Sequence, residues 1–169
     1  MRIHPFAKDA GLRLFAPAFT ERVSQQARQA PHDAALQTEA GAAERLAAVT
    51  IEAYVRAQDL DVCGLRVLFD GARCTVHVQG QAAHQASREK AVLCCGNVQG
   101  VAQVHDLMTV VAHAGCSRFH RVSNGDSLPQ IAEHCYGDAA CWPRILDANR
   151  PMLHAPDHIY SGQVLRIPA

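Results

Sequence analysis

The chain has 169 residues, 49% of them hydrophobic and 19% charged, and its formal net charge is zero when the histidines are neutral. This balance is typical of a soluble globular protein and gives no basis for strong attraction to nucleic acid or anionic lipid. No apolar run approaches the roughly 20 residues of a membrane helix, and the first residues lack the run of about 7–15 apolar residues of a secretory signal. We therefore expect a cytoplasmic protein that does not insert into a membrane.

The first forty residues form the least regular part of the sequence. The stretch FAKDAG at 6–11 predicts one or two helical turns that end at Gly11, or a longer amphipathic helix that reaches Phe15. Residues 18–42 are rich in Ala, Gln, Thr and Glu, and they fit either a helix or a linker. We expect residues 1–41 to form an N-terminal segment that packs on the next domain and is partly linker.

Residues 42–112 predict a compact α+β domain with the element order α-β-β-α-β. Apolar residues at helical spacing predict a helix over 44–60. The stretch 65–80 reads as a hairpin, in which Asp70 and Gly71 supply a tight turn because both tolerate positive φ.

The second half of this domain predicts one more helix and one more strand. Residues 84–95 are polar first and apolar last, which favours a helix. Gly96 is the expected left-handed stop just beyond its end. Residues 96–111 then turn into the third strand, and glycines at 96 and 100 allow the backbone between them to turn tightly.

A connector at 113–117 leads to a second domain at 118–169, whose order is β-α-α-β. Short apolar runs at both ends of this domain predict strands, and two short helices lie between them. Ser127 is the expected N-cap of the first helix, and Gly137 is its expected end.

Cysteine and histidine usage indicates neither a disulfide framework nor a catalytic centre. The seven cysteines are odd in number and form no CxxC pair, so we expect free thiols without a bound metal. Ser127 has His120 and His134 within a few residues. Cys135 adjoins His134. Neighbouring positions do not supply the geometry of a catalytic triad, and Ser127 already has a capping role, so we expect no enzymatic activity.

The C-terminal pattern resembles a LysM domain, and the middle pattern resembles a BON domain through its helix, DG hairpin, second helix and GNVQGV turn. The stretches FAKDAG, GNVQGVAQV and NRPMLHAPDHIYSGQVLRIP together are similar to the bacterial cytoplasmic potassium-binding protein family built as BON plus LysM. The resemblance covers nearly the whole chain except about 18–42. The residues that match the LysM pattern are Phe119, Val122, Gly125, Asp126, Ser127, Leu128, Ile131, Ala132, Tyr136, Trp142, Ile145, Asn149, Ile159, Gly162, Gln163, Leu165, Arg166, Ile167 and Pro168.

This resemblance implies a K⁺-binding ion sensor in a stress response, with K⁺ as its ligand and no enzymatic activity; we expect a monomer. K⁺ suits neutral backbone carbonyls, which helix ends leave unpaired and which lie at the negative end of the helix dipole. Binding is expected to order the N-terminal segment and to tighten BON against LysM. Glycine-capped helix ends with water on the carbonyls are the alternative interpretation. By resemblance, the ligands are the main-chain oxygens of Ala7, Ala10, Gly96, Val98 and Val101.

The second hypothesis is binding of peptidoglycan or chitin-type glycan in the cell envelope. LysM domains hold N-acetylated sugars between the first strand–helix loop and the second helix–strand loop. The helical spacing of Trp142 favours a core role over a stacking platform. A lipid-binding role has no support, because the sequence carries neither a lipobox nor a basic amphipathic helix. The residues of the two LysM loops are Gly125, Asp126, Ser127, Leu128, Asn149 and Ile159.

Overall fold

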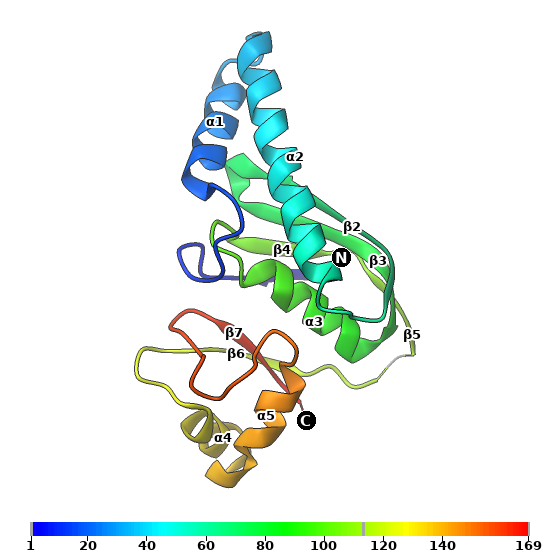
Figure 1. Cartoon of the computed structure of the whole chain (residues 1–169), viewed down its shortest axis with the longest axis vertical. Helices are drawn as coiled ribbons and strands as arrows, with labels where there is room; N and C mark the ends of the chain where they lie inside the picture. Colours follow the sequence, from blue (N-terminus) through cyan, green and yellow to red (C-terminus); the bar gives the residue numbers. More distant parts are fainter. Residues whose placement is uncertain (1, 113, 169) are drawn as a thin grey trace.

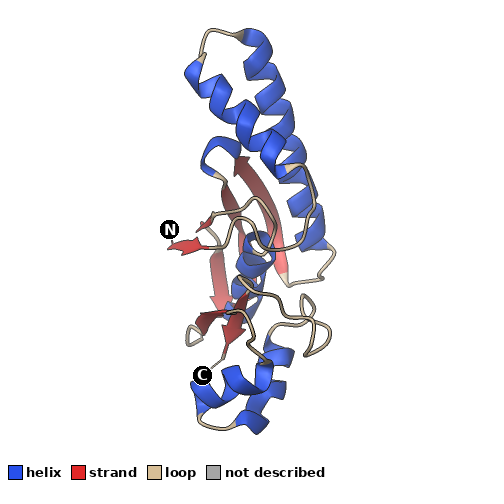
Figure 2. Cartoon of the chain, turned by 90° about the vertical axis from the view of Figure 1, so that its left-hand side faces the viewer, coloured by secondary structure: helices blue, strands red, loops and turns tan. Residues whose placement is uncertain are grey.

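The structure of the chain is a computed structural model that describes residues 2–112 and 114–168, and it has the α+β architecture that the sequence predicts (Figure 1). A helical hairpin lies at one end of the long axis, a sheet covered by α3 and by the second half of α2 lies in the middle, and a small α+β unit lies at the other end (Figures 1 and 2). The elements in chain order are β1 (Arg2–Pro5), α1 (Pro17–Gln29), α2 (Ala34–Arg56), β2 (Val62–Asp70), the 3₁₀ turn η1 (Gly71–Arg73), β3 (Thr75–His84), α3 (Gln85–Gly96), β4 (Gln103–Asp106), β5 (Thr109–Ala112), β6 (Arg118–Arg121), α4 (Leu128–Tyr136), the 3₁₀ turn η2 (Ala139–Cys141), α5 (Trp142–Ala148) and β7 (Val164–Ile167).

The central sheet has the strand order β1-β4-β3-β2, and β5 pairs with the far half of β3. Strands β2 and β3 are antiparallel, β3 runs parallel to both β4 and β5, and β1 is antiparallel to β4. Val76 and Val78 of β3 are fully buried in the core that the sheet shares with α2 and α3. His77 lies between them on the opposite face, as the period-2 alternation predicts. Its ring packs edge to face against that of His105, with the ring centroids 4.7 Å apart.

Residues 18–42, for which the sequence allows either a helix or a linker, are mostly helical. Residues 17–29 and 34–56 form two antiparallel helices, so the helix predicted over 44–60 begins ten residues earlier and ends at Arg56. Asp33 caps α2 by accepting hydrogen bonds from the next helical N–H groups. Small buried side chains, such as Ala27 and Ala40, allow the two helices to approach closely. The alanines of this stretch therefore form the packing surface between the two helices of a hairpin.

The segment FAKDAG forms no helix, because its first residue, Phe6, continues from β1 into the main core. Phe6 is buried in the main core, and its N–H donates to Ala102 O at 2.8 Å directly after β1. The ring of Phe6 lies where a β-carbon on Gly96 would be. Gly96 is the last residue of α3 and has no positive φ, so the prediction of a left-handed stop there is wrong. The position requires glycine because an aromatic ring packs against its backbone.

Two further predictions in the middle domain need correction. The hairpin closes through η1 rather than a two-residue turn, and Cys74 takes the left-handed conformation with φ 50°. The third strand predicted within 96–111 is two strands, β4 and β5, because residues 107–108 separate them, and the loop from Asn97 to Ala102 precedes both. Gly100 in this loop has φ +96°, which agrees with its predicted turning role.

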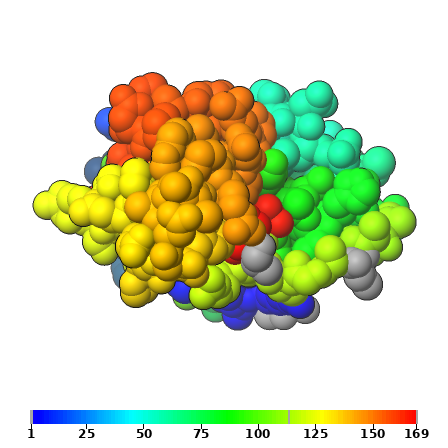
Figure 3. All heavy atoms as spheres, turned by 90° about the horizontal axis from the view of Figure 1, so that it is seen from below, coloured from blue at the N-terminus to red at the C-terminus, as the bar shows by residue number. Residues whose placement is uncertain are grey.

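The C-terminal unit is built as the local signals predict. Ser127 caps α4 and shares a hydrogen bond with Gln130, and Gly137 ends α4 in the left-handed conformation with φ 76°. Leu128, Ile131 and other apolar side chains of α4, α5 and β7 form its core. Viewed from below, this unit covers one end of the molecule beside the middle domain (Figure 3). Across the described residues, no helix is both long and apolar enough to cross a bilayer. All seven cysteines are free.

Candidate cation site

The N-terminal residues 6–12 lie along the loop at 97–102, between α3 and β4. Backbone hydrogen bonds join these two segments, which are distant in sequence, at several points along their length. The contact brings a turn of the N-terminal segment against the C-terminal end of α3. The bonds run from Phe6 N to Ala102 O (2.8 Å), from Gly100 N to Lys8 O (2.7 Å), from Leu12 N to Asn97 O (2.9 Å) and from Gln99 N to Leu12 O (3.0 Å).

The carbonyls expected to bind K⁺ lie on these two adjoining segments. Ala7 O accepts the N–H of Ala10 at 3.0 Å, and Val98 O accepts the N–H of Val101 at 3.1 Å. In the described part of the chain, the carbonyls of Ala10, Gly96 and Val101 accept no backbone hydrogen bond outside the helices and strands. A carbonyl has two lone pairs, so the oxygens that already accept one bond also keep capacity. The two segments therefore present main-chain oxygens with unused acceptor positions.

A third segment, from the C-terminal domain, lies against the same turn. Gly162 stands in the loop before β7 with φ +86°, and a β-carbon there would lie 2.9 Å from that of Ala10 and 3.0 Å from that of Ala7. No larger side chain fits at this point without displacing the N-terminal turn. Sequence reasoning did not assign Gly162 to the site, because it resembles an ordinary turn glycine of the C-terminal pattern.

The charges around the turn do not form a cage for a divalent ion. No cluster of three or more His, Cys, Asp or Glu side chains occurs among residues 2–112 and 114–168. The ammonium group of Lys8 points to Glu21, with Nζ 3.0 Å from both carboxylate oxygens, and this hydrogen bond raises the pKa of Lys8. The nearest lysine is thus paired with a carboxylate. Apart from the exposed carboxylate of Asp9, the acceptors that remain in the turn are main-chain oxygens.

Asn97, the residue after α3, connects all three segments. Its side-chain nitrogen donates to Val164 O at 2.9 Å and contacts the sulfur of Met152, while its side-chain oxygen accepts the N–H of Val164 at 2.8 Å. Its main-chain oxygen accepts from Leu12 N and from the hydroxyl of Tyr160 at 3.4 Å. Asn97 is only 6% exposed. Within GNVQGV it reads as a plain loop residue, so sequence reasoning missed it.

A cavity of about 380 Å³ lies beside Asn97 and is lined from both domains. Burial raises the pKa of Tyr160 to about 12 and also raises that of Tyr54, so both phenols are neutral hydrogen-bonding groups at physiological pH. The cavity places polar groups next to the end of the predicted site. Its other lining side chains include Gln58, His154, His158 and Gln163.

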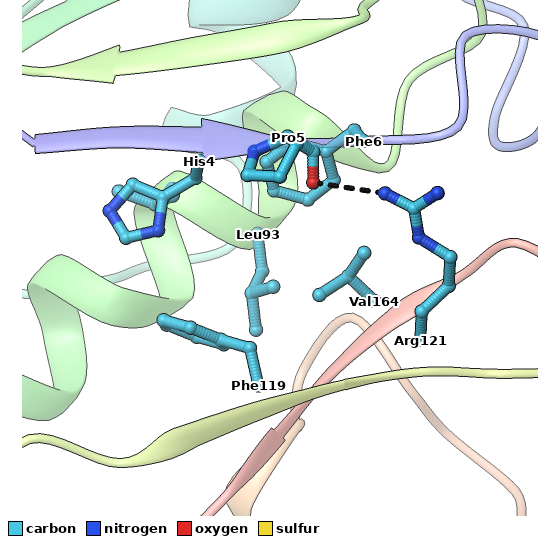
Figure 4. Close-up of a pocket in the computed structure, with 8 residues that line it drawn as sticks. His4, Pro5, Phe6, Leu93, Phe119, Arg121 and Val164 are labelled. Carbon is cyan, nitrogen blue, oxygen red and sulfur yellow. Dashed lines mark hydrogen bonds between the residues drawn. The ribbon is translucent and has the colours of Figure 1, made fainter.

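A second cavity, of about 230 Å³, lies between β1, α3 and the C-terminal strands and is mainly apolar (Figure 4). Arg121 reaches across it and donates to Pro5 O at 3.4 Å. The rings of His4 and Phe119 meet edge to face with centroids 5.5 Å apart. Burial lowers the pKa of His4, which favours the neutral imidazole in this apolar setting. This cavity is a contact surface between the domains and offers few oxygens to a cation.

The residues of the glycan hypothesis are mostly engaged in holding the C-terminal fold. Leu128 is fully buried, and Ile159 packs against the core. Gly125 is an exposed turn residue with φ +86°. Asp126 accepts from Ser123 N at 2.8 Å, a bond that lowers the pKa of Asp126, and it lies 3.3 Å from His120. Trp142 packs against the same core, in agreement with its helical spacing.

Comparisons with known proteins agree with this architecture. Residues 42–112 match the BON domain family and residues 120–168 match the LysM domain family, so the chain is a two-domain protein with BON followed by LysM. The chain is 43% identical over 91 residues to the potassium binding protein Kbp of Escherichia coli O6:H1. The aligned part covers 54% of this chain and 61% of Kbp, which is less than two thirds of that relative's length. The relative's name describes a binding protein and no enzyme.

Proposed function

We propose that this chain is a cytoplasmic K⁺ sensor that holds the ion with main-chain oxygens of the N-terminal turn and of the loop after α3. The observation that carries the proposal is the docking of residues 6–12 along residues 97–102, which places the two groups of carbonyls on adjoining segments. The similarity to the potassium binding protein Kbp supports the choice of ion. The proposed ligands are the carbonyls of Ala7, Ala10, Gly96, Val98 and Val101.

The chemistry of the site favours a monovalent ion. K⁺ is large and weakly polarising, and neutral carbonyl dipoles replace its water shell without concentrated negative charge. Ca²⁺ and Mg²⁺ require carboxylates, and the described residues contain no such cluster. The C-terminal end of α3 adds the partial negative charge of the helix dipole at Gly96.

We also propose that binding tightens the BON domain against the LysM domain. Gly162 of the LysM domain lies so close to Ala7 and Ala10 that a β-carbon on it would come within 3.0 Å of theirs, so any ordering of the N-terminal turn changes the surface on which the LysM loop rests. An ion that binds better to the docked arrangement shifts the population toward it. Small-angle scattering and amide exchange in K⁺ and Na⁺ buffers test this coupling, and identical results in both buffers would contradict it.

The proposal is tested by thermal unfolding of the whole chain in KCl, NaCl and choline chloride at equal ionic strength. A ligand that binds only the folded state adds RT ln(1 + [L]/Kd), which is about 2.7 kcal/mol at one hundred times Kd. We expect a rise in Tm of several degrees that is specific to KCl. Equal unfolding curves in the three salts would refute K⁺ binding. Chitin oligomers are the matched ligand for the glycan hypothesis, and we expect no shift with them.

A further inference from the structure

In the two-stranded sheet of the LysM domain, β7 pairs with β6 along one edge and has no strand partner along its other edge among the described residues. The N–H of Val122 donates to Gln163 O, and β6 pairs with β7 in antiparallel register up to Arg118 and Ile167. Alternate residues of an antiparallel strand face its partner. The peptide groups of Val164 and Arg166 therefore face the open edge, where no further strand follows in the described part of the chain.

Two asparagine side chains occupy this edge in the same manner. Asn149, which follows α5, donates to Arg166 O at 2.8 Å and accepts from Arg166 N at 2.7 Å. Asn97, which follows α3 of the BON domain, donates to Val164 O at 2.9 Å and accepts from Val164 N at 2.8 Å. The first amide comes from within the LysM domain and the second from across the domain boundary. An amide that satisfies both groups of one residue replaces a missing strand at that position.

Asn97 also belongs to the loop that carries the proposed ligands. It stands between Gly96 and Val98, and its own carbonyl accepts the N–H of Leu12 from the N-terminal segment. Any rotation of this residue about the backbone changes the direction of the two neighbouring carbonyls. The hydrogen bonds to β7 thus fix the loop at Asn97, which lies directly between the proposed ligands Gly96 and Val98.

We propose that Asn97 is the positioning residue of the cation site: its paired hydrogen bonds to Val164 hold the loop in the orientation that binds K⁺, and so link K⁺ affinity to LysM docking. This inference rests on the proposed K⁺ function. Linkage requires the reverse effect of equal size, so K⁺ must strengthen the contact between Asn97 and β7. No proposed ligand is altered when this residue is replaced, since all of them are main-chain oxygens.

The test is a titration of the whole chain with KCl at constant ionic strength, followed by fluorescence of Trp142, the single tryptophan, which lies in the LysM domain. We compare the wild type with Asn97→Ala and with the control Glu89→Gln. Glu89 lies two turns earlier on α3 and contacts Arg166 at 2.7 Å, so its variant weakens the same domain contact without touching the loop. We expect Asn97→Ala to bind K⁺ about tenfold more weakly, in the lower part of the roughly 5–150-fold range usual for coupling between sites. Glu89→Gln is expected to weaken K⁺ binding by only about twofold, because it loosens the domain contact but leaves the Asn97 bonds that orient the loop.

The outcomes separate the two proposals. A wild type without a K⁺-specific change refutes the proposed function and this inference with it. A wild type that binds K⁺, beside an Asn97→Ala variant of equal affinity or a Glu89→Gln variant that is equally weakened, overturns the inference alone. If Asn97→Ala does not fold, Asn97→Asp replaces it, because the carboxylate keeps the acceptor for Val164 N and loses only the donor. The added negative charge by itself attracts K⁺, so weaker binding by Asn97→Asp supports positioning and stronger binding overturns it.

Discussion

Asn97 and Asn149 make the same pair of hydrogen bonds to neighbouring positions of β7, but they belong to different domains. Asn149 is 1% exposed and also donates to Ile145 O, so its amide is enclosed by its own domain. Asn97, at 6% exposed, is buried through contacts with the LysM domain docked on the BON domain. Water can reach Val164 when the domains separate, whereas it reaches Arg166 only when the LysM domain unfolds. The same chemistry therefore stabilises a fold in one case and a contact between folds in the other.

The largest expected effect comes from breaking the internal pair. Asn149→Ala leaves the N–H and the C=O of Arg166 buried without partners, and each such group costs about 1–3 kcal/mol. We expect a loss of about 3 kcal/mol or more in the free energy of unfolding of the LysM domain. Urea titration followed by Trp142 fluorescence measures it. Asn97→Ala is expected to cost clearly less in the same assay, and an equal or larger loss would contradict the distinction drawn here.

A second change tests the other side of the loop, where the N-terminal segment docks. A β-carbon at Gly96 would overlap the ring of Phe6, although alanine is otherwise favoured over glycine in a helix. Overpacking of this kind costs about 1–3 kcal/mol. We therefore expect Gly96→Ala to destabilise the chain by about 2 kcal/mol, and to speed amide exchange of Gly100, which donates to Lys8 O.

Gly115→Ala is the matched control, because a β-carbon at Gly115 meets nothing within 4 Å. Its amide exchange pattern and its stability should equal those of the wild type. A Gly96→Ala chain that is as stable as this control would show that Phe6 does not hold the N-terminal segment at α3.

The smallest expected effect concerns the charged contact between the domains. Burial opposes ionisation of Glu89, but hydrogen bonds from Arg166, Gln85 and Ser117 outweigh it, so the pKa of Glu89 lies below its ordinary value of 4.5. The unfolded chain then takes up the proton first as pH falls. The contribution of ionised Glu89 to the free energy of unfolding is therefore fully present above about pH 4.5, and it is lost as the pH falls through the pKa of Glu89 in the folded chain.

We expect this loss to be smaller than those of the two substitutions above, because it comes from a single carboxylate. Unfolding by urea at a series of pH values from 6 to 3 measures it, with Glu89→Gln as the comparison. The difference in stability between the wild type and Glu89→Gln should shrink toward acid. A difference that stays constant over this range would rule out Glu89 as its source.

The parts of the fold that local signals determine could be predicted. The caps at Ser127 and Gly137 and the apolar spacing of α4 and α5 define the LysM domain, because each signal acts within a few residues. The hairpin of α1 and α2 could not be predicted, since its alanine-rich surface gains stability only when both helices are present. The helix predicted at 6–11 failed for a similar reason: Phe6 gains more by burial against Gly96 than by local helix formation.

The candidate site shows the same division. The resemblance named carbonyls on two segments that the structure brings side by side. It did not identify Asn97 or Gly162, whose roles depend on contacts across 67 positions of sequence for Asn97 and Val164. A buried polar side chain with both its donor and its acceptor satisfied is recognisable only once its partner strand is placed.

The edge of β7 also bears on how this protein behaves at high concentration. An unpaired strand edge offers its peptide groups to any other chain, and this is a common route to aggregation and to exchange of strands between molecules. In the docked molecule the BON domain shields the Val164 end of that edge with Asn97. Each opening of the two domains uncovers it. If K⁺ favours the docked arrangement, as we propose, it also protects the chain against self-association, and storage in sodium buffers then favours the loss of monomer.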